Sequence, residues 1–420
     1  MKLAIIGTGI SGLVAAYRLC GRHEVTLFEA LDYVGGHTNT VDVEWDGERH
    51  AIDTGFIVYN DWTYPNFIAL LDELGVASQP TTMSFSVQDE RTGLEYNGHS
   101  LSTLFAQRRN LLRPSFYRLL WEIARFNRIG TEWQTNVAAT EPEATVAEFL
   151  ARHRFSAAFC EQYLLPMGAA IWSCPAGTFG TFPLRFILEF FRNHGLLNIR
   201  NRPTWRVVQG GSRSYVQALT LPFRDRIRLN APVQQVRRLA DSVKVVSRTR
   251  ESETFDHVIF ACHSDQALSL LGETATATER EVLSAIPYSR NVAVLHTDVR
   301  VLPRRQRAWA SWNVCVREAS SARPVAVTYN MNILQGLTSR HTFCVTLNDE
   351  SRIAPENVLR RFEYQHPIFT AQRTVTQSRH GELLNANRTS FCGAYWGNGF
   401  HEDGVNSALA VVSALGRITS

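Results

Sequence analysis

The sequence of 420 residues predicts an α/β protein made of a discontinuous parallel-sheet domain and a second α+β domain. Three observations predict this fold class. The chain opens with an apolar strand, a glycine-rich turn and a helix. A strand, turn and helix pattern returns near residue 255 and again near residue 390. Between residues 291 and 347, strand candidates are separated by loops instead of crossover helices. The first two patterns are typical of a Rossmann-like domain, and the third favours a mixed or antiparallel sheet.

The opening strand and turn contain a dinucleotide-binding motif. The apolar run Lys2–Ile6 is followed at once by glycines with the spacing G-x-G-x-x-G: Gly7, Gly9 and Gly12. In such a turn the first glycine permits a tight bend, the second lets the backbone approach a pyrophosphate, and the third lets the helix pack closely on the strand. The motif therefore predicts a bound dinucleotide.

A helix and a second strand follow in register with that motif. The helix begins at Ile10, ends near Cys20, and offers the free amides of its first turn, including that of Ser11, to phosphates. The second strand, Val25–Phe28, ends in Glu29, whose carboxylate can accept hydrogen bonds from ribose hydroxyls. The order of elements is the context that makes the glycine spacing credible.

A second glycine-rich turn favours FAD over a nicotinamide dinucleotide. It spans residues 33–40, and its candidate cofactor contacts are Gly35, Gly36, His37 and Thr38. A hairpin is predicted next, at Thr40–Trp45 and Glu48–Asp53 around Asp46-Gly47. After the hairpin, small and aromatic residues are expected to lie along a flavin: Gly55 and Phe56.

The last thirty residues predict a strand, a loop rich in glycine and aromatic residues, and an apolar helix ending near Leu415. The amide end of such a helix can stabilise negative charge on a reduced flavin. We expect further cofactor contacts in this loop and at the start of a strand near residue 233: Val233, Gly393, Trp396, Gly404 and Val405.

Composition restricts the class of protein. A net charge of only +4 argues against nucleic acid as a partner, and no apolar run approaches the roughly 18 residues of a membrane-spanning helix. The seven cysteines are scattered without metal-ligand spacing, which favours reduced thiols, a cytoplasmic location and no metal. Of the 43 basic residues only Lys2 and Lys244 are lysines.

The region from about residue 101 to residue 194 is predicted to be mostly helical. Apolar residues at 116, 119, 120, 123 and 126 form one stripe, while arginines between Arg108 and Arg128 give the segment a basic face. Leu184–Phe191 is apolar nearly all round. We expect this combination either to dock on anionic lipid as a peripheral membrane contact or to be a solvated face beside a buried helix.

Taken together, these motifs resemble the flavin amine oxidase and phytoene desaturase superfamily. Within it the chain is most similar to the FAD-binding oxidoreductases found beside, or fused to, cyclopropane fatty acid synthases. The segments that carry this finer resemblance are residues 105–110, 171–175, 202–205, 308–313 and 399–404. The resemblance implies FAD as cofactor, a lipid acyl chain as substrate, and association with a methyltransferase like cyclopropane fatty acid synthase. We expect the FAD to be noncovalent, because the candidate cysteine, Cys392, lies in a strand-like run just before Gly393.

The resemblance also implies two domains. An FAD-binding domain would comprise residues 1–80, 205–265 and 385–420, and a substrate-binding domain residues 81–204 and 266–384. Two positions depart from the superfamily pattern. His37 stands where many members have an arginine after the paired glycines, and Ala394 stands where many have an acid, so the nearest acids are Glu402 and Asp403.

The leading functional hypothesis is an FAD-dependent oxidoreductase that transfers two electrons as hydride from a hydrophobic substrate. Trp172, Tyr395 and Trp396 are candidate walls beside the flavin, and His401 is the candidate acid or base because imidazole titrates near neutrality. A flavin amine oxidase is the closest alternative, although neither lysine is well placed to hold a water beside the flavin. A non-redox isomerase or a lipid carrier of the same fold is the second alternative.

Overall fold

The first strand is the centre of a parallel sheet in the computed structural model, which describes residues 1–136, 144–198, 200–248, 250–317, 325–368 and 370–416. All neighbours in this sheet run parallel, for example with Ile5 beside both Leu27 and Ile259. The strands, in spatial order, are β10 (Ile227–Arg228), β2 (Glu24–Phe28), β1 (Lys2–Ile6), β14 (His257–Phe260) and β20 (Thr389–Phe391).

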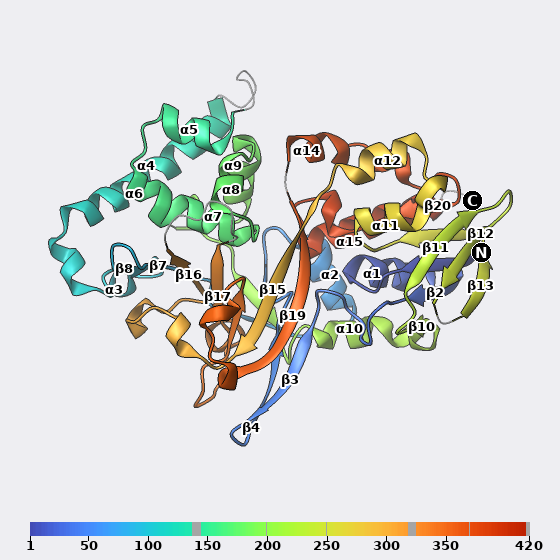
Figure 1. Cartoon of the computed structure of the whole chain (residues 1–420), viewed down its shortest axis with the longest axis horizontal. Coiled ribbons are helices and arrows are strands. Elements are labelled where there is room, and N and C mark those ends of the chain that lie inside the picture. Colours follow the sequence, from blue (N-terminus) through green and yellow to red (C-terminus); the bar gives the residue numbers. More distant parts are fainter. Residues whose placement is uncertain (137–143, 199, 249, 318–324, 369, 417–420) are drawn as a thin grey trace.

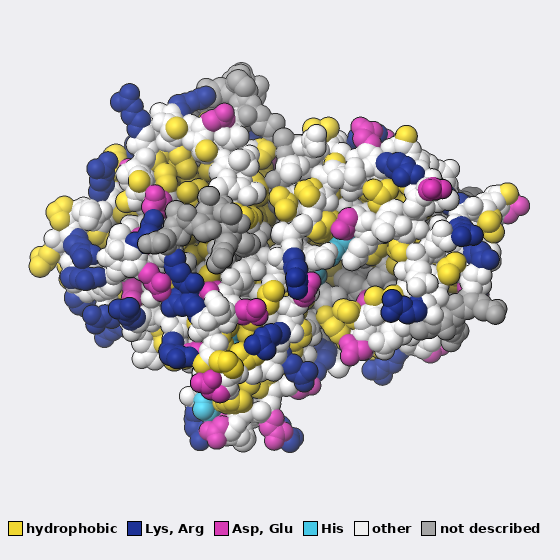
Figure 2. Space-filling view, in the orientation of Figure 1, with side chains coloured by type: hydrophobic (Ala, Val, Ile, Leu, Met, Phe, Trp, Pro, Cys, Tyr) yellow, Lys and Arg dark blue, Asp and Glu magenta, His cyan; other side chains and the backbone are white. Residues whose placement is uncertain are grey.

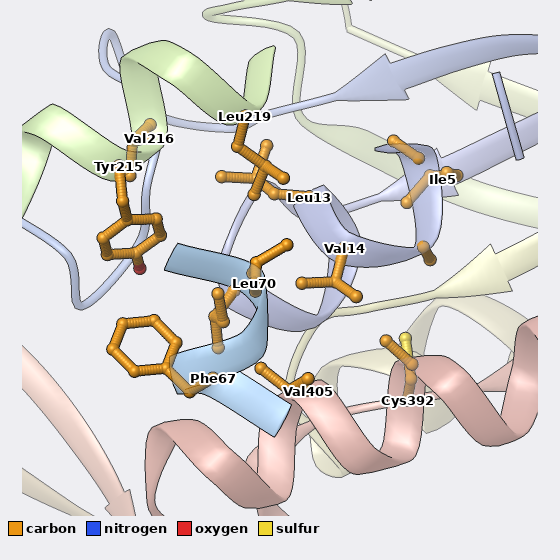
Figure 3. Close-up of a cluster of buried hydrophobic side chains, with 14 of the residues drawn as sticks. Ile5, Leu13, Val14, Phe67, Leu70, Tyr215, Val216, Leu219, Cys392 and Val405 are labelled. Carbon is orange, nitrogen blue, oxygen red and sulfur yellow. The ribbon is translucent and has the colours of Figure 1, made fainter. Parts of the chain in front are cut away.

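Both faces of this sheet are buried, which explains why β1 is apolar without alternation. Leu3 and Ile5 point into one core and Ala4 and Ile6 into another. Four helices cover the first face: α1 (Ile10–Leu19), α2 (Pro65–Glu73), α10 (Arg213–Thr220) and α15 (His401–Gly416). Figure 3 shows α1 at the centre of this core, with side chains of α2, α10 and α15 around it.

The second face packs against a small antiparallel sheet and two helices. Its members are β11 (Val233–Arg238), β12 (Val243–Ser247), β13 (Arg250–Phe255), α11 (Ser264–Leu271) and α12 (Ala277–Ser284). The sequence predicted one strand over Phe255–Ala261; the structure divides it at Asp256, whose carboxylate accepts a hydrogen bond from the backbone N–H of Lys2 at 2.7 Å. That prediction was wrong in its start because the chain turns there to enter β14.

A seven-stranded sheet lies beside the parallel sheet (Figure 1). It is mixed, as predicted, because the β16–β7 pair is parallel and the other pairs are antiparallel. Its strands, in spatial order, are β19 (Val358–Pro367), β15 (Tyr288–His296), β18 (Cys344–Leu347), β17 (Ala326–Asn330), β16 (Trp312–Val316), β7 (Phe85–Asp89) and β8 (Leu94–Asn97).

Shorter elements connect the two large sheets. The predicted hairpin is present with its expected bounds, β3 (Thr40–Trp45) and β4 (Glu48–Asp53), and projects from the molecule in Figure 1. A three-stranded sheet has the order β5 (Tyr59–Asn60), β9 (Trp205–Val208) and β6 (Ser78–Pro80). The remaining short helices are α13 (Met331–Gln335), between β17 and β18, and α14 (Ala371–Gln377), between β19 and β20.

A helical region with its own core lies above the seven-stranded sheet in Figure 1. Its helices are α3 (Leu101–Leu104), α4 (Pro114–Asn136), α5 (Val146–Arg152), α6 (Ala157–Phe159), α7 (Leu165–Ile171), α8 (Ala176–Gly180) and α9 (Leu184–Asn193). The segment Leu184–Phe191, apolar nearly all round in sequence, lies in α9, which exposes Arg185 and Glu189 and buries most of its apolar side chains in the core.

The strands of the parallel sheet come from residues 1–80, 205–265 and 385–420, and those of the seven-stranded sheet from residues 81–204 and 266–384. The exact domain boundaries stay a prediction. In the described part of the chain, no helix combines the length and the apolar character needed to cross a bilayer.

Candidate active site

A cavity of about 830 Å³ lies where the carboxyl ends of β1, β2 and β14 face the seven-stranded sheet. One wall contains Gly7, Glu29 and Ala261, which follow those strands, and the opposite wall contains Trp312 and Tyr329 of β16 and β17. Ligands of open α/β sheets bind beyond the carboxyl ends of the strands, so this cavity is the candidate active site.

The first glycine turn lines one end of the cavity. A Cβ atom at Gly12 would lie 2.1 Å from the carbonyl oxygen of Gly7, so the third glycine is required for packing of α1. A Cβ atom at Gly9 would meet no protein atom within 4 Å, and Gly9 is the N-cap of α1 without any side-chain cap. The α1 amides therefore face open space, as an anion site requires.

The second glycine turn closes against the first. A Cβ atom at Gly36 would lie 3.2 Å from the Cα of Gly9, so the two turns meet at the same point. Glu29 lies beside them and is only 7% exposed; its carboxylate accepts hydrogen bonds from the Thr8 amide at 3.0 Å, the Thr8 hydroxyl at 2.5 Å and the Leu31 amide at 3.0 Å. These bonds hold the carboxylate at the cavity wall.

Three histidines meet at the cavity beyond the second glycine turn. The ring centroid of His37 lies 5.4 Å from that of His366 and 6.2 Å from that of His263, and Tyr364 lies 4.9 Å from His37. Burial lowers the pKa of all three imidazoles, with His366 falling to about 4. The buried Nε2 of His37 has no hydrogen-bond partner among the described residues and so remains available to a ligand.

Asp53 fixes the hairpin to the start of α10. The fully buried carboxylate accepts hydrogen bonds from the Thr40 hydroxyl at 2.6 Å and from the amide and hydroxyl of Ser212 at 2.9 and 2.7 Å. Burial raises the pKa of Asp53 to about 6 in spite of these donors. The carboxylate thus anchors the segment that presents Gly55 and Phe56 to the cavity.

The C-terminal loop forms another wall of the cavity. Gly393 and Tyr395 line it, and Gln377 holds the loop by donating hydrogen bonds to the carbonyl oxygens of Tyr395 and Gly397 at 2.7 and 2.6 Å. Trp396 points away and stacks on His380, with ring centroids 4.1 Å apart. Trp396 does not line the cavity, and its contact with the flavin stays a prediction.

His401 is the first residue of α15 and lies beneath Phe56. The two rings stack with centroids 3.4 Å apart, and the Nε2 of His401 lies 2.9 Å from the Tyr215 hydroxyl and 3.0 Å from the Thr38 hydroxyl. Burial lowers the pKa of His401 to about 3. The imidazole is therefore neutral at physiological pH, and its role as an acid or base stays a prediction.

The acids after His401 serve the protein's own backbone. Glu402 accepts hydrogen bonds from the amides of Asn66 at 3.0 Å and Phe67 at 2.8 Å, at the start of α2. Asp403 accepts one from the amide of Phe400 at 2.9 Å. Neither carboxylate lines the cavity.

We expect Glu402→Ala to lower the free energy of unfolding by about 2 kcal/mol, because hydrogen bonds to charged groups are each worth roughly 1.5–3 kcal/mol and the bond from the Phe67 amide is buried. Asn406→Ala is the matched control. The Asn66 side chain donates to both Glu402, at 3.0 Å, and Asn406, at 2.8 Å, but the bond to Asn406 is exposed, so its loss should cost less than about 0.5 kcal/mol. Urea denaturation measures both. Equal midpoints for the two variants would refute this role of Glu402.

The end of the cavity away from the glycine turns is apolar. Ile171 and Trp172 approach it from the end of α7, and Trp312, Tyr329 and Leu347 approach it from the seven-stranded sheet. Trp172 is 6% exposed and packs on Phe190, with ring centroids 4.8 Å apart. A rigid aromatic wall of this kind excludes water from whatever occupies the cavity.

Most residues singled out from the sequence line this cavity. They are Gly7, Gly9, Ile10, Ser11, Glu29, Gly35, Gly36, His37, Gly55, Phe56, Val233, Gly393, Trp172, Tyr395 and His401. Their individual roles stay predictions. Five predicted contacts do not line the cavity: Gly12, Thr38, Trp396, Gly404 and Val405.

Gly404 and Val405, like Gly12, have a clear packing role. A Cβ atom at Gly404 would lie 2.7 Å from Ile10 Cγ2, so this glycine lets α15 cross α1, and Val405 belongs to the core between those helices. Sequence reasoning missed His263, His366, Trp312 and Tyr329. His263 could have been found, because it follows a predicted strand at the edge where ligands bind.

The residues of the cavity fit an extended dinucleotide. An uncapped helix N-terminus, an open position at Gly9, an acid at the end of β2 and an orphaned imidazole nitrogen all face the same space. The adjoining apolar end is suited to a flat, largely hydrophobic ring system and a substrate. Fold and site together define a flavin-binding class of protein.

Comparisons with known proteins give the family. Residues 10–321 match the profile described as flavin containing amine oxidoreductase, and the chain belongs to this family. It is 26% identical over 264 residues to the "Putative flavin-containing monoamine oxidase AofH" of Mycobacterium tuberculosis, covering 60% of this chain and 55% of that protein. The chain thus spans about half the length of that relative. A shorter stretch of 68 residues is 49% identical to an L-amino-acid oxidase of Pseudechis australis and covers 13% of each protein.

Solved structures share the fold. Cyclohexylamine oxidase from Brevibacterium oxydans superimposes with a TM-score of 0.68 at 16% identity and 99% coverage of both chains. The fatty acid isomerase from P. acnes that produces CLA superimposes with a TM-score of 0.66 at 14% identity, covering 100% of this chain and 98% of that one. The family consists of flavin-containing oxidoreductases, and FAD is the cofactor that membership implies.

Proposed function

We propose that the chain catalyses two-electron oxidation of a hydrophobic substrate, with a lipid acyl chain as the substrate class. FAD supplies the chemistry when bound, by accepting a hydride at its flavin ring. The apolar end of the cavity carries the proposal. Its side chains are aromatic or aliphatic, and both acids that line the cavity already have partners: Glu29 with Thr8 and Leu31, and Glu363 with Arg290.

The protein's own residues would bind and orient the substrate and exclude water from it. Trp172, Trp312 and Tyr329 provide flat surfaces against which an acyl chain can lie. We assign His401 a positioning role, because its neutral imidazole supports the ring of Phe56 and is hydrogen-bonded to two hydroxyls. Tyr395 stays a candidate for contact with the reacting atoms. The association with a cyclopropane fatty acid synthase stays a prediction.

Amine oxidation is the second candidate, because relatives and structural neighbours carry amine oxidase names. In this chain no lysine lines the cavity in the described residues, since Lys2 and Lys244 lie in β1 and β12. Because both acids that line the cavity already have partners, an amine substrate would be bound in its neutral form by the aromatic wall. A third candidate is isomerisation of a lipid without net oxidation, which the structural likeness to a fatty acid isomerase supports.

Anaerobic mixing of the FAD-loaded protein with two panels separates these candidates. Unsaturated and cyclopropane acyl lipids form one panel, and primary and secondary amines form the other. We expect acyl lipids to bleach the visible flavin absorption and amines to leave it unchanged. Bleaching by amines alone would identify an amine oxidase. A shifted double bond without bleaching, detected by mass spectrometry of the lipid, would identify an isomerase.

A further inference from the structure

Large apolar side chains are exposed together at the end of the molecule farthest from the parallel sheet. They belong to α3, to the 3₁₀ turn η1 (Arg108–Leu112) and to the first half of α4. The exposed fraction is 76% for Leu101, 88% for Leu112 and 61% for Trp121, and Leu111 and Tyr117 are about half exposed. We call this set the tip surface.

Arginines surround the tip surface. Residues 101–131 contain six arginines and one acid, Glu122, which is 2% exposed and bonded to the amide and hydroxyl of Ser156. A second element adds charge, because the loop and 3₁₀ turn η6 (Gln306–Ala308) beside α3 expose further arginines. The exposed basic residues of this face are Arg108, Arg109, Arg118, Arg304, Arg305 and Arg307. Figure 2 shows dark blue side chains around this end with yellow ones at its edge.

The tip surface is held by the fold and is no loose loop. A capping box between Ser100 and Thr103 begins α3, and the Tyr117 hydroxyl donates to the carbonyl oxygen of Leu111 at 3.0 Å. Gln107 ties η1 to β8 by accepting from the amide of Glu95 at 3.1 Å. Phe116, one residue before Tyr117, is buried in the core below. The leucines are therefore displayed in a defined geometry.

We propose that the tip surface docks on the anionic lipid of a membrane. Exposed leucines, a tyrosine and a tryptophan amid arginines match the layered chemistry of a bilayer interface, in which apolar side chains enter the acyl boundary and guanidinium groups meet phosphates. Nucleic acid offers phosphates but no apolar layer for Leu101 and Leu112, so the leucines favour the membrane. The proposal goes beyond the proposed function, since docking does not depend on which substrate is oxidised.

The structure also changes which residues take part. The sequence suggested Leu184–Phe191 as the apolar partner of the arginines, but α9 buries that face in the helical core. The lipid contact instead uses Leu101, Leu112 and Trp121, which lie among the arginines themselves.

Sedimentation of the FAD-loaded full chain with vesicles tests this proposal. We expect binding to phosphatidylglycerol vesicles that weakens with added salt, and little binding to pure phosphatidylcholine. In the triple variant Leu101→Ser, Leu112→Ser, Trp121→Ser, the affinity for these vesicles should fall by roughly tenfold or more. Arg108→Gln with Arg118→Gln should weaken binding and flatten its salt dependence.

The matched control is Leu221→Ser with Leu239→Ser, which removes leucines that are 68% and 50% exposed outside the tip surface. This control should bind vesicles like the unmodified chain, and thermal melting and bound FAD should be unchanged in every variant. Equal vesicle binding by the triple variant and the control would overturn the proposal. Absence of vesicle binding by the unmodified chain would also overturn it. Binding of a labelled RNA oligonucleotide in place of vesicles would show that the arginines contact nucleic acid and not lipid.

Discussion

Gly9→Ala is expected to remove tight FAD binding while the fold is preserved. A Cβ atom at this position meets no protein atom within 4 Å, and Gly9 has φ −65° and ψ 175°, which alanine adopts freely. The added methyl group would occupy the space through which a pyrophosphate reaches the α1 amides. Overpacking typically costs about 1–3 kcal/mol, so the dissociation constant should rise roughly ten- to hundredfold.

Gly21→Ala is the matched control for that substitution. A Cβ atom at Gly21 also meets no protein atom within 4 Å, but this residue follows α1 and does not line the cavity. Fluorescence titration with FAD should give the same dissociation constant for the control as for the unmodified chain, and urea midpoints should agree for all three proteins. If Gly9→Ala binds FAD as tightly as the control, the phosphate site is not at the opening turn.

The FAD-free protein is expected to lose stability steeply below pH 6.5. Burial lowers the pKa of His194, His257, His296 and His366 to about 4. Each imidazole binds a proton in the unfolded chain near its ordinary pKa of about 6.5 but not in the native state. Stability from these groups is thus complete above that pH and is lost as the pH falls toward 4.

The expected size is large. A shift of this kind corresponds to roughly 3 kcal/mol per histidine, and a native protein is stable by only about 5–15 kcal/mol. Asp53 acts in the opposite direction, because its pKa is raised to about 6, so its contribution is lost as the pH rises. One carboxylate cannot balance several histidines, and the free energy of unfolding should increase with pH between 4 and 6.5.

Urea denaturation at several pH values measures this dependence, with His296→Gln as the diagnostic variant. His296 is fully buried, lies in β15, and does not line the cavity. Its replacement should reduce the slope by about one proton, or roughly 1.4 kcal/mol per pH unit. His99→Gln, at an exposed position, should leave the slope unchanged. A flat profile for the unmodified chain would contradict the account of these histidines.

Local patterns predicted the nucleotide end of the site. The strand, glycine turn, helix and Glu29 are contiguous, so their signals reinforce one another, and the hairpin was recognised from Asp46-Gly47. The mixed sheet was recognised from the loops between its strands. Its edge strand β19 was missed, because Arg360, Arg361 and Glu363 interrupt any alternation, although charged side chains are common on edge strands.

Contacts between distant segments could not be predicted in this way. Ser212 reaches Asp53 across 159 positions, and His366 reaches the cavity from the unpredicted β19. Gly404 was assigned to the flavin because its motif resembles a cofactor loop, but the glycine is needed where α15 crosses α1. The sequence also does not reveal burial: His401 was predicted as an acid or base from its ordinary pKa, which its buried position lowers to about 3.

The most direct test of the account is a titration of the FAD-free chain with FAD, followed by flavin fluorescence. The account predicts saturation at one FAD per chain, loss of tight binding in Gly9→Ala and its retention in Gly21→Ala. A folded chain that takes up no FAD, or that binds it equally well with Gly9 replaced, would contradict the assignment of this cavity.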